Sequence, residues 1–177
     1  ALGPVRRTPI ICSLQVIPRK YALSGDWESL YREVKEFRQA CGRAHMKTIL
    51  ATGELPDFSS VYTCSMVCMM AGADFIKTST GKEKTNATLE VSLVMLRAIR
   101  DYHERTGFKV GFKPAGGIRT AKQAIMFLVL MKEELGDAWL NNELFRLGAS
   151  TLLTDIERQL HHCAFKEYAA SHYMPMP

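Results

Sequence analysis

Two lysines, Lys77 and Lys113, stand where a lysine side chain is able to act as a nucleophile. Each follows a short apolar run, in "ADFIK" and "KVGFK", and each is followed within a few residues by a loop that contains glycine. A lysine held next to a second cation, or away from water, loses its proton more readily and can then attack a carbonyl carbon. The pair therefore predicts Schiff-base chemistry.

The two amines are expected to be neighbours, because one crossover helix separates the two strands that carry them. Consecutive strands of a βαβ unit usually pair, and paired strands lie roughly 4.8 Å apart. Two like charges about 4 Å apart, at an effective dielectric near 20, repel by roughly 4 kcal/mol. Since one pKa unit corresponds to about 1.36 kcal/mol, this repulsion lowers one lysine pKa by about three units, from about 10.4 to near physiological pH.

Two loops rich in glycine and hydroxyl residues predict a site for an anion. The first contains Gly116 and Gly117, in "PAGG", just before a predicted helix. The second contains Ser150 and Thr151, in "GAST", which open the last predicted helix. Phosphate sites of (β/α) barrels are commonly built from the last two βα loops and a helix N-terminus. Lys82, in "TGK", is close enough in sequence to the first lysine to reach the same anion.

Each of these features has a simpler explanation when it stands alone. A lysine at the end of a strand often extends to solvent, and a glycine loop is often only a turn. The functional interpretation depends on their combination, in which two lysines occupy matching positions and two glycine loops occupy the last two units.

The elements that must position these residues alternate between strands and helices. Apolar residues at three- and four-residue spacing predict helices, and short apolar runs near glycines predict strands. Helices are expected over 27–41, 60–70, 87–107, 120–136 and 151–170, and strands over 46–51, 73–79, 109–117 and 144–150, with a fifth candidate strand at 10–17. This order is typical of an α/β fold with a parallel sheet. Its ligand site lies at the carboxyl ends of the strands, where Lys77, Lys113 and Gly148 fall.

The composition bounds the class of protein. A chain of 177 residues is long enough for one domain with a core, and it has no apolar stretch long enough to cross a bilayer. Five cysteines without framework spacing indicate reduced thiols and a cytoplasmic protein. The net charge is +5, but the lysines and arginines are spread along the chain. A small anionic substrate is therefore favoured as partner over nucleic acid or a membrane.

The segments "ADFIKTSTGK", "VGFKPAGGIRT" and "FRLGASTLL" together resemble the deoxyribose-phosphate aldolase family of class I aldolases. The segments "WESLYREVKEFRQACG", "HMKTILATGEL" and "WLNNELFRLGAS" are similar to its eukaryotic members, and the resemblance runs from about Arg19 to nearly the end of the chain. It implies a (β/α)8 TIM barrel, of which this chain holds only the C-terminal four to five βα units. It also implies chemistry without a metal or an organic cofactor, because the imine serves as the electron sink.

The resemblance further implies a reaction and a role for each site residue. The reaction is the reversible retro-aldol cleavage of 2-deoxy-D-ribose 5-phosphate to D-glyceraldehyde 3-phosphate and acetaldehyde, a step of deoxyribonucleoside degradation. Lys77 is the implied Schiff-base residue, and Lys113 is the cation that lowers its pKa and helps to move protons. The positions that match the family's residues for substrate and phosphate are Lys47, Thr80, Lys82, Gly116, Gly117, Ser150 and Thr151.

Two departures from the family pattern lie near the N-terminus. The first three or so βα units have no counterpart, so we expect an atypical segment over 1–18, a partial barrel over 19–170 and a tail over 171–177. Leu14 stands where the family carries an aspartate that relays protons with the second lysine. Because general acid–base groups typically contribute about 10²–10⁴-fold, we expect turnover to be slow.

Two other functions stay open from the sequence. A non-catalytic binder of phosphosugars or nucleic acid would keep the basic pocket and lack the relay. A different Schiff-base aldolase would use the same lysines on another sugar phosphate. The open strand edges of an incomplete barrel also favour self-association, so a homo-oligomer is expected.

Overall fold

The structure is a computed structural model that describes residues 11–173. Its centre is one parallel sheet with the strand order β1-β2-β3-β4. The strands are β1 (Ile11–Val16), β2 (His45–Ile49), β3 (Phe75–Lys77) and β4 (Gly111–Lys113). The predicted α/β fold, an incomplete parallel barrel with crossover helices, is confirmed. Residues 1–10 of the expected atypical segment and 174–177 of the expected tail lie outside the described residues.

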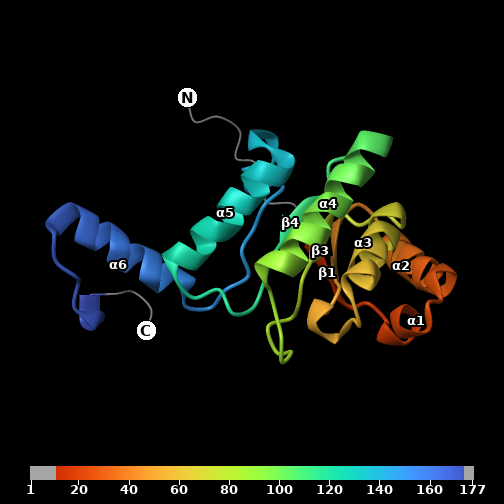
Figure 1. The fold of residues 1–177 in the computed structure, drawn as a ribbon, viewed down its shortest axis with the longest axis horizontal. Coiled ribbons are helices and arrows are strands. Elements are labelled where there is room, and N and C mark those ends of the chain that lie inside the picture. Colours follow the sequence, from red (N-terminus) through yellow and green to blue (C-terminus); the bar gives the residue numbers. More distant parts are fainter. Residues whose placement is uncertain (1–10, 174–177) are drawn as a thin grey trace.

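Helices connect the strands and cover one face of the sheet (Figure 1). They are α1 (Arg19–Ser24), α2 (Trp27–Cys41), α3 (Phe58–Met70), α4 (Leu89–Thr106), α5 (Ala121–Leu135) and α6 (Leu152–Phe165), with single 3₁₀ turns at η1 (Thr52–Glu54), η2 (Asp137–Trp139) and η3 (Ser171–Tyr173). Helices α2 to α5 pack side by side in chain order, and α6 lies at one end of this row against α5 (Figure 1).

Local capping sets most of the helix boundaries. Asp26, Asp57 and Thr88 each accept a hydrogen bond from a backbone N–H in the first turn of α2, α3 and α4. Thr120 forms a capping box at the start of α5. Helix α4 ends at Thr106 and is capped by Gly107, whose φ of 76° lies in the left-handed region that favours glycine. These signals lie in the sequence next to the helices, which explains why the helices could be predicted.

The two faces of the sheet differ in chemistry. Met46, Ile76 and Phe112 are buried in the main apolar core together with the helices. Because successive residues of a strand point to opposite faces, the residues between them form a second face, which would line the interior of a closed barrel. The members of this second face are Lys47, Ile49, Phe75, Lys77, Gly111 and Lys113.

The strand predicted over 144–150 is not a regular strand, and this prediction is wrong in part. The segment forms two isolated bridges to β4 and the residues after it. The Phe112 N–H donates to the Leu144 carbonyl over 2.8 Å, and the Gly148 N–H donates to the Pro114 carbonyl over 2.8 Å. Pro114 has no N–H to donate in return, so the ladder is interrupted there.

Other boundaries also differ from the prediction. The six-residue helix α1 was not predicted, and α6 ends at Phe165 rather than at residue 170. Strand β3 ends at Lys77 because the Thr78 hydroxyl, in place of a backbone carbonyl, accepts the Ala115 N–H over 2.9 Å. Within residues 11–173, no helix combines the length and the apolar character needed to cross a membrane.

Candidate functional site

Lys77 and Lys113 are the last residues of β3 and β4, and they are direct partners in the register of the two strands. Side chains of directly paired residues in a parallel sheet leave the same face, with the strands roughly 4.8 Å apart. Both side chains are partly buried. The structure therefore brings the two lysines together at the carboxyl end of the sheet, as the sequence predicted.

Lys47 and Arg146 add two further cations to this face. Lys47, on β2, pairs with Phe75 and is only 7% exposed. The Arg146 guanidinium lies over the Phe75 ring, 4.8 Å from its centroid. We call Lys47, Lys77, Lys113 and Arg146 the cationic cluster. The sequence analysis did not single out Arg146, although a charged residue inside the apolar run "LFRLG" is the same signal that marks the lysines.

The pKa values of all three lysines in the cationic cluster are lowered, and burial is the largest cause for each. Burial, followed by repulsion from Lys113 and Lys77, lowers the pKa of Lys47 to about 8. Burial and then Lys113 lower the pKa of Lys77, while Glu83 opposes this shift. Burial and then Arg146 lower the pKa of Lys113. Loss of water contacts thus exceeds repulsion between the amines as the reason for the lowered pKa values.

A cavity of about 390 Å³ opens beside Lys77 between the loops that follow β3, β4 and the 144–148 segment. It brings together six of the predicted site residues, which are Lys77, Thr80, Lys82, Gly116, Gly117 and Ser150. Lys47, Lys113 and Thr151 are not in its wall, and Arg119 is an additional cation in it that the sequence analysis did not identify. The residues predicted for an anion site therefore line a hollow with cationic and glycine walls.

Glycine lets two of these loops approach each other closely. Gly81 has φ 94° and Gly116 has φ 86°, both in the left-handed region. A Cβ on Gly81 would lie 3.8 Å from the Gly116 Cα, and a Cβ on Gly116 would lie 2.7 Å from the Asn86 side chain. The walls of the cavity meet at these two glycines, and Gly116 leaves no room for a larger residue.

The hydroxyl groups after Lys77 hold the loops together. The buried Ser79 hydroxyl donates to the Ala115 carbonyl over 2.6 Å, and the Thr78 hydroxyl bonds to the same residue. The Thr80 hydroxyl, which the family resemblance suggested as a substrate contact, donates to the Glu83 carboxylate over 2.9 Å. In this structure the hydroxyl run therefore shapes the cavity.

The start of α5, which was expected to contribute to the anion site, is already capped by the protein. The N–H groups of Arg119 and Thr120 donate to the Gln123 side-chain oxygen over 2.8 and 3.1 Å. The Ala121 N–H donates to the Asp155 carboxylate over 2.7 Å. These donors are thus engaged within the chain, and the glycine loop before them remains as the wall that faces the cavity.

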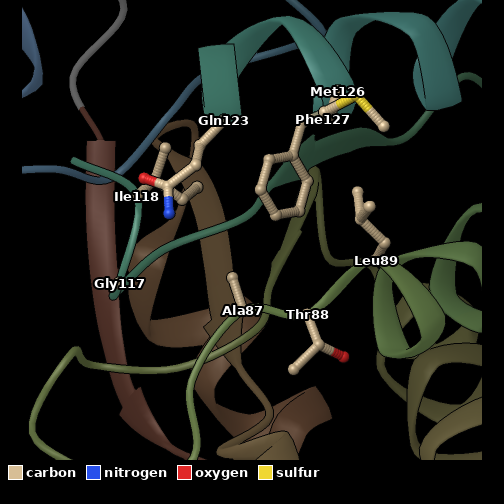
Figure 2. Close-up of a pocket in the computed structure, with 8 residues that line it drawn as sticks. All are labelled: Ala87, Thr88, Leu89, Gly117, Ile118, Gln123, Met126 and Phe127. Carbon is tan, nitrogen blue, oxygen red and sulfur yellow. The ribbon is translucent and has the colours of Figure 1, made fainter. Parts of the chain in front are cut away.

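A second cavity, of about 260 Å³, lies behind these loops between the starts of α4 and α5 (Figure 2). Its lining is mainly apolar, with Leu89, Met126 and Phe127 around it, and includes no lysine or arginine. It lacks the charge that a phosphate group needs. In the described part of the chain, no three His, Cys, Asp or Glu side chains form a group able to hold a metal ion.

Comparison of the sequence with known proteins gives the same family as the motifs. Residues 14–155 match the sequence model of the DeoC/LacD family of aldolases. The chain is 63% identical to the deoxyribose-phosphate aldolase of Homo sapiens over 161 residues, which is 91% of this chain and 51% of the human protein. The chain therefore spans about half the length of this relative.

Comparison of the fold gives similar structures. A Toxoplasma gondii protein assigned as a deoxyribose-phosphate aldolase is similar with a TM-score of 0.72 and 28% identity, over 84% of this chain and 58% of that protein. The tetrameric deoxyribose-phosphate aldolase of Aeropyrum pernix is similar in fold with a TM-score of 0.62 and 23% identity, over 84% of this chain and 55% of that protein.

Proposed function

Because this chain belongs to the DeoC/LacD family of aldolases, we propose that it carries the Schiff-base site of a deoxyribose-phosphate aldolase. The proposed reaction is the reversible cleavage of 2-deoxy-D-ribose 5-phosphate to D-glyceraldehyde 3-phosphate and acetaldehyde. The observation that supports it most directly is the register of β3 and β4, which pairs Lys77 with Lys113 at the edge of a cavity with cationic walls. Residues 19–170 are the proposed aldolase part of the chain.

Lys77 is the proposed nucleophile. Its lowered pKa leaves more free amine at neutral pH than an exposed lysine has, and the free amine attacks the C1 aldehyde of the open-chain sugar. Loss of water gives an imine. The C2–C3 bond then breaks with its electron pair moving into the imine, while the proton of the C3 hydroxyl leaves to a base. The C3 carbon becomes a carbonyl, and this fragment leaves as D-glyceraldehyde 3-phosphate. The resulting enamine takes up a proton, and hydrolysis releases acetaldehyde and restores the amine.

Lys113 is the proposed partner in proton transfer. It stands opposite Lys77 in the register, and its own pKa is lowered by burial and by Arg146, so that it can both take up and return a proton. The phosphate group would bind in the 390 Å³ cavity, near Lys82, Gly116, Gly117 and Ser150. Lys47 would face the sugar from the next strand.

The proposed turnover is slow because β1 contributes no carboxylate. Its residues Ile11–Val16, "ICSLQV", contain none, and Leu14 occupies the position at which the family resemblance implies a relay aspartate. A missing general acid–base group typically costs about 10²–10⁴-fold in rate. Imine formation at Lys77 does not need that group as strictly as carbon–carbon cleavage does.

The missing carboxylate also supports a second candidate function, a phosphosugar binder that forms no product. Among ligands for such a binder, a small anion is favoured over nucleic acid, since Lys47 is buried and both Lys77 and Lys113 are partly buried. Nucleic acid binding needs lysines and arginines that reach the phosphate backbone from an exposed surface.

Reductive trapping tests the proposed function. The chain is incubated with acetaldehyde, or with 2-deoxyribose 5-phosphate, in the presence of cyanoborohydride, and the modified residue is located by peptide mass spectrometry. We expect one adduct at Lys77, its loss in Lys77→Arg, and its persistence in Lys84→Arg, which changes an exposed lysine on the same loop. A coupled assay for glyceraldehyde 3-phosphate measures turnover.

Each outcome separates the candidates. An adduct at Lys77 with release of glyceraldehyde 3-phosphate supports the aldolase. An adduct or phosphate binding without product supports the binder. Absence of any adduct at Lys77, or equal modification of Lys77 and Lys84, would contradict the Schiff-base proposal.

A further inference from the structure

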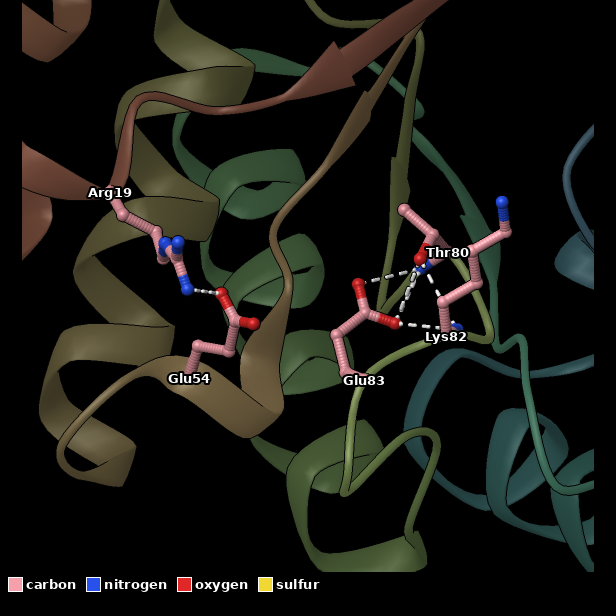
Figure 3. A network of polar contacts seen from close by, with 5 residues as sticks. All are labelled: Arg19, Glu54, Thr80, Lys82 and Glu83. Atoms are coloured by element: carbon pink, nitrogen blue, oxygen red, sulfur yellow. Dashed lines mark hydrogen bonds and ion pairs between the residues drawn. The ribbon is translucent and has the colours of Figure 1, made fainter.

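Glu83 stands in the loop after Lys77 and folds back on that loop. Its carboxylate accepts hydrogen bonds from the backbone N–H groups of Thr80, Gly81 and Lys82, over 2.9, 3.0 and 3.1 Å. It also accepts the Thr80 hydroxyl over 2.9 Å (Figure 3). Successive N–H groups that converge on one point form a binding site for an anion. Here the anion is a side chain of the protein itself.

Glu83 reaches this backbone anion site from the side opposite to the 390 Å³ cavity, whose wall contains Gly116 and Gly117. A further cavity, of about 350 Å³, is lined by Glu83 together with Arg19 and Glu54, which form an ion pair (Figure 3). Thr80 and Lys82 line both this cavity and the 390 Å³ cavity, whereas Glu83 lines only the former. The turn over 80–82 thus separates the two cavities. Its N–H groups bind the Glu83 carboxylate, which lines only the 350 Å³ cavity.

We propose that Glu83 is a positioning residue that occupies the backbone anion site of residues 80–82, so that the phosphate of the substrate binds across the cavity, against Gly116, Gly117 and Ser150. This inference rests on the proposed function, since it concerns where that substrate's phosphate binds. In this proposal the Thr80–Lys82 turn contributes to phosphate binding through the side chain of Lys82, and its backbone N–H groups do not contact the phosphate.

The contacts around the turn are consistent with this role. The Asn86 amide donates to the Glu83 carbonyl over 2.8 Å, and the Asn86 side-chain oxygen lies 2.9 Å from the Ser79 hydroxyl oxygen. Asn86 in turn lies against Gly116. Through Asn86, the loop that carries Glu83 therefore contacts the glycine loop on the other side of the 390 Å³ cavity. The Lys82 ammonium points away from the Glu83 carboxylate (Figure 3).

The charge of Glu83 supports the proposal. Burial acts to raise the pKa of Glu83, but the hydrogen bonds from Thr80 and Gly81 outweigh burial and hold the pKa below its ordinary value. The carboxylate is then ionised at neutral pH, and a phosphate dianion cannot share the same donors because the two anions repel each other. Removal of the Glu83 charge should remove this repulsion and weaken the hydrogen bonds by which the side chain holds these donors.

Phosphate titration of Glu83→Gln tests the inference with inorganic phosphate as the probe. We expect the variant to bind inorganic phosphate roughly tenfold more tightly than the unchanged chain by calorimetry, the effect of about one added charge-assisted hydrogen bond. Glu54→Gln, the same chemical change on the far side of the 350 Å³ cavity, should leave the affinity unchanged. Glu83→Asp keeps the charge on a shorter side chain, so its affinity for phosphate should lie between those of the unchanged chain and Glu83→Gln.

The pH profile of trapping by acetaldehyde, which has no phosphate, gives a second measurement. The charged groups around Lys77 are the other members of the cationic cluster, Lys82 and Arg119 in the wall of the same cavity, and Glu83 on its own loop. Among them, Lys113 lowers the pKa of Lys77 and Glu83 raises it. In Glu83→Gln the profile should therefore move to lower pH. A merely structural role would reduce trapping at all pH values alike.

The outcomes distinguish this inference from the proposed function. Unchanged or weaker phosphate binding in Glu83→Gln, or the same gain in Glu54→Gln, would overturn the inference even if Lys77 forms its adduct. Failure of Lys77 to form an adduct would instead overturn the proposed function, whatever the phosphate titration shows. Should Glu83→Gln fail to fold, the comparison of Glu83→Asp with the unchanged chain decides, since the shorter side chain should show a partial gain.

Discussion

Lys47 carries a positive charge into an almost fully buried position on β2. Burial and the three other cations of the cationic cluster all lower its pKa, and in the described part of the chain no carboxylate offsets them. An unpaired buried charge is destabilising, because water no longer solvates it. The cationic cluster is thus held together by the packing of the sheet and the helices, in spite of its own electrostatics.

Replacement of Lys47 by methionine should stabilise the fold at neutral pH. The folded-state pKa of about 8 lies below the ordinary value of 10.5, so between these two pH values the unfolded chain binds more protons and stability rises with pH. Lys47→Met removes this dependence and should gain about 1–3 kcal/mol at neutral pH. Urea unfolding at neutral and alkaline pH measures the difference, which should shrink as the pH approaches 10.5.

The control for this prediction is Lys35→Met, which changes an exposed lysine on α2. It should alter stability by a few tenths of a kcal/mol at most, and equally at both pH values. A Lys47→Met variant that is less stable than the unchanged chain at neutral pH would show that the lysine has a stabilising partner.

Replacement of Lys113 by methionine should move the pH profile of Schiff-base trapping at Lys77 to higher pH. Lys113 is the second cause, after burial, that lowers the pKa of Lys77, and Lys47 and Glu83 remain in place in the variant. The pKa of Lys77 therefore rises, and each unit of that rise lowers the fraction of free amine about tenfold. Cyanoborohydride trapping rates with acetaldehyde over a series of pH values measure the shift.

Lys109→Met is the matched control, because it removes an exposed lysine just before the same strand. Its profile should coincide with that of the unchanged chain. A profile that does not move in Lys113→Met would show that repulsion between the two lysines contributes nothing to the reactivity of Lys77.

At the scale of the elements, the 144–148 segment is held to β4 by only a few hydrogen bonds around Pro114. Gly148 lies at the closest approach, since a Cβ there would lie 2.5 Å from the Ala115 Cβ and 3.2 Å from the Lys113 Cε. This segment carries Arg146 and leads to Ser150, so its distance from β4 sets the width of the cavity.

Gly148→Ala should therefore destabilise the chain and weaken phosphate binding together. The added methyl group must displace Ala115 or the whole segment, and such overpacking typically costs about 1–3 kcal/mol. Thermal unfolding and phosphate calorimetry report the two effects. Ala149→Ser, which adds one atom at the neighbouring exposed position, is the control and should change stability little. Unchanged stability in Gly148→Ala would mean that the segment moves freely away from β4.

At the scale of the whole molecule, apolar side chains are exposed on the two helices at one end of the row. Ile125 and Val129 of α5 are 55% and 50% exposed, and Leu153 and Leu160 of α6 are 61% and 64% exposed. Contiguous exposed apolar surface is typical of an interaction site or of self-association.

We predict that the chain self-associates through this end of the helix row. Ile125→Glu combined with Val129→Glu should lower the apparent mass in sedimentation experiments, because two charges then have to be buried for the helices to associate. Glu133→Gln, a change at an exposed polar position of the same helix, should leave the mass unchanged. Association that persists unaltered in the double variant would place the contact elsewhere.

The alternation of strands and helices, most helix boundaries and the pairing of the two lysines could be predicted from the sequence alone. These features depend on local signals, namely caps, apolar spacing and glycines, and on the tendency of consecutive parallel strands to pair. Lys77 and Lys113 could be placed together because each ends a strand, and one crossover helix connects the two strands.

The folded structure was needed to identify the other groups that act on those lysines. Burial is the largest cause of the lowered pKa of each lysine. This burial results from the packing of helices and strands from most of the chain. Arg146 joins the cationic cluster across the interrupted ladder at Pro114, and Glu83 meets its three N–H donors only when the turn at Gly81 adopts its left-handed conformation. Spacing along the chain does not specify the Arg146 contact, since it exists only after segments distant in sequence have packed together. The Glu83 contacts are local in sequence, but they depend on a backbone conformation that the residue types alone do not specify.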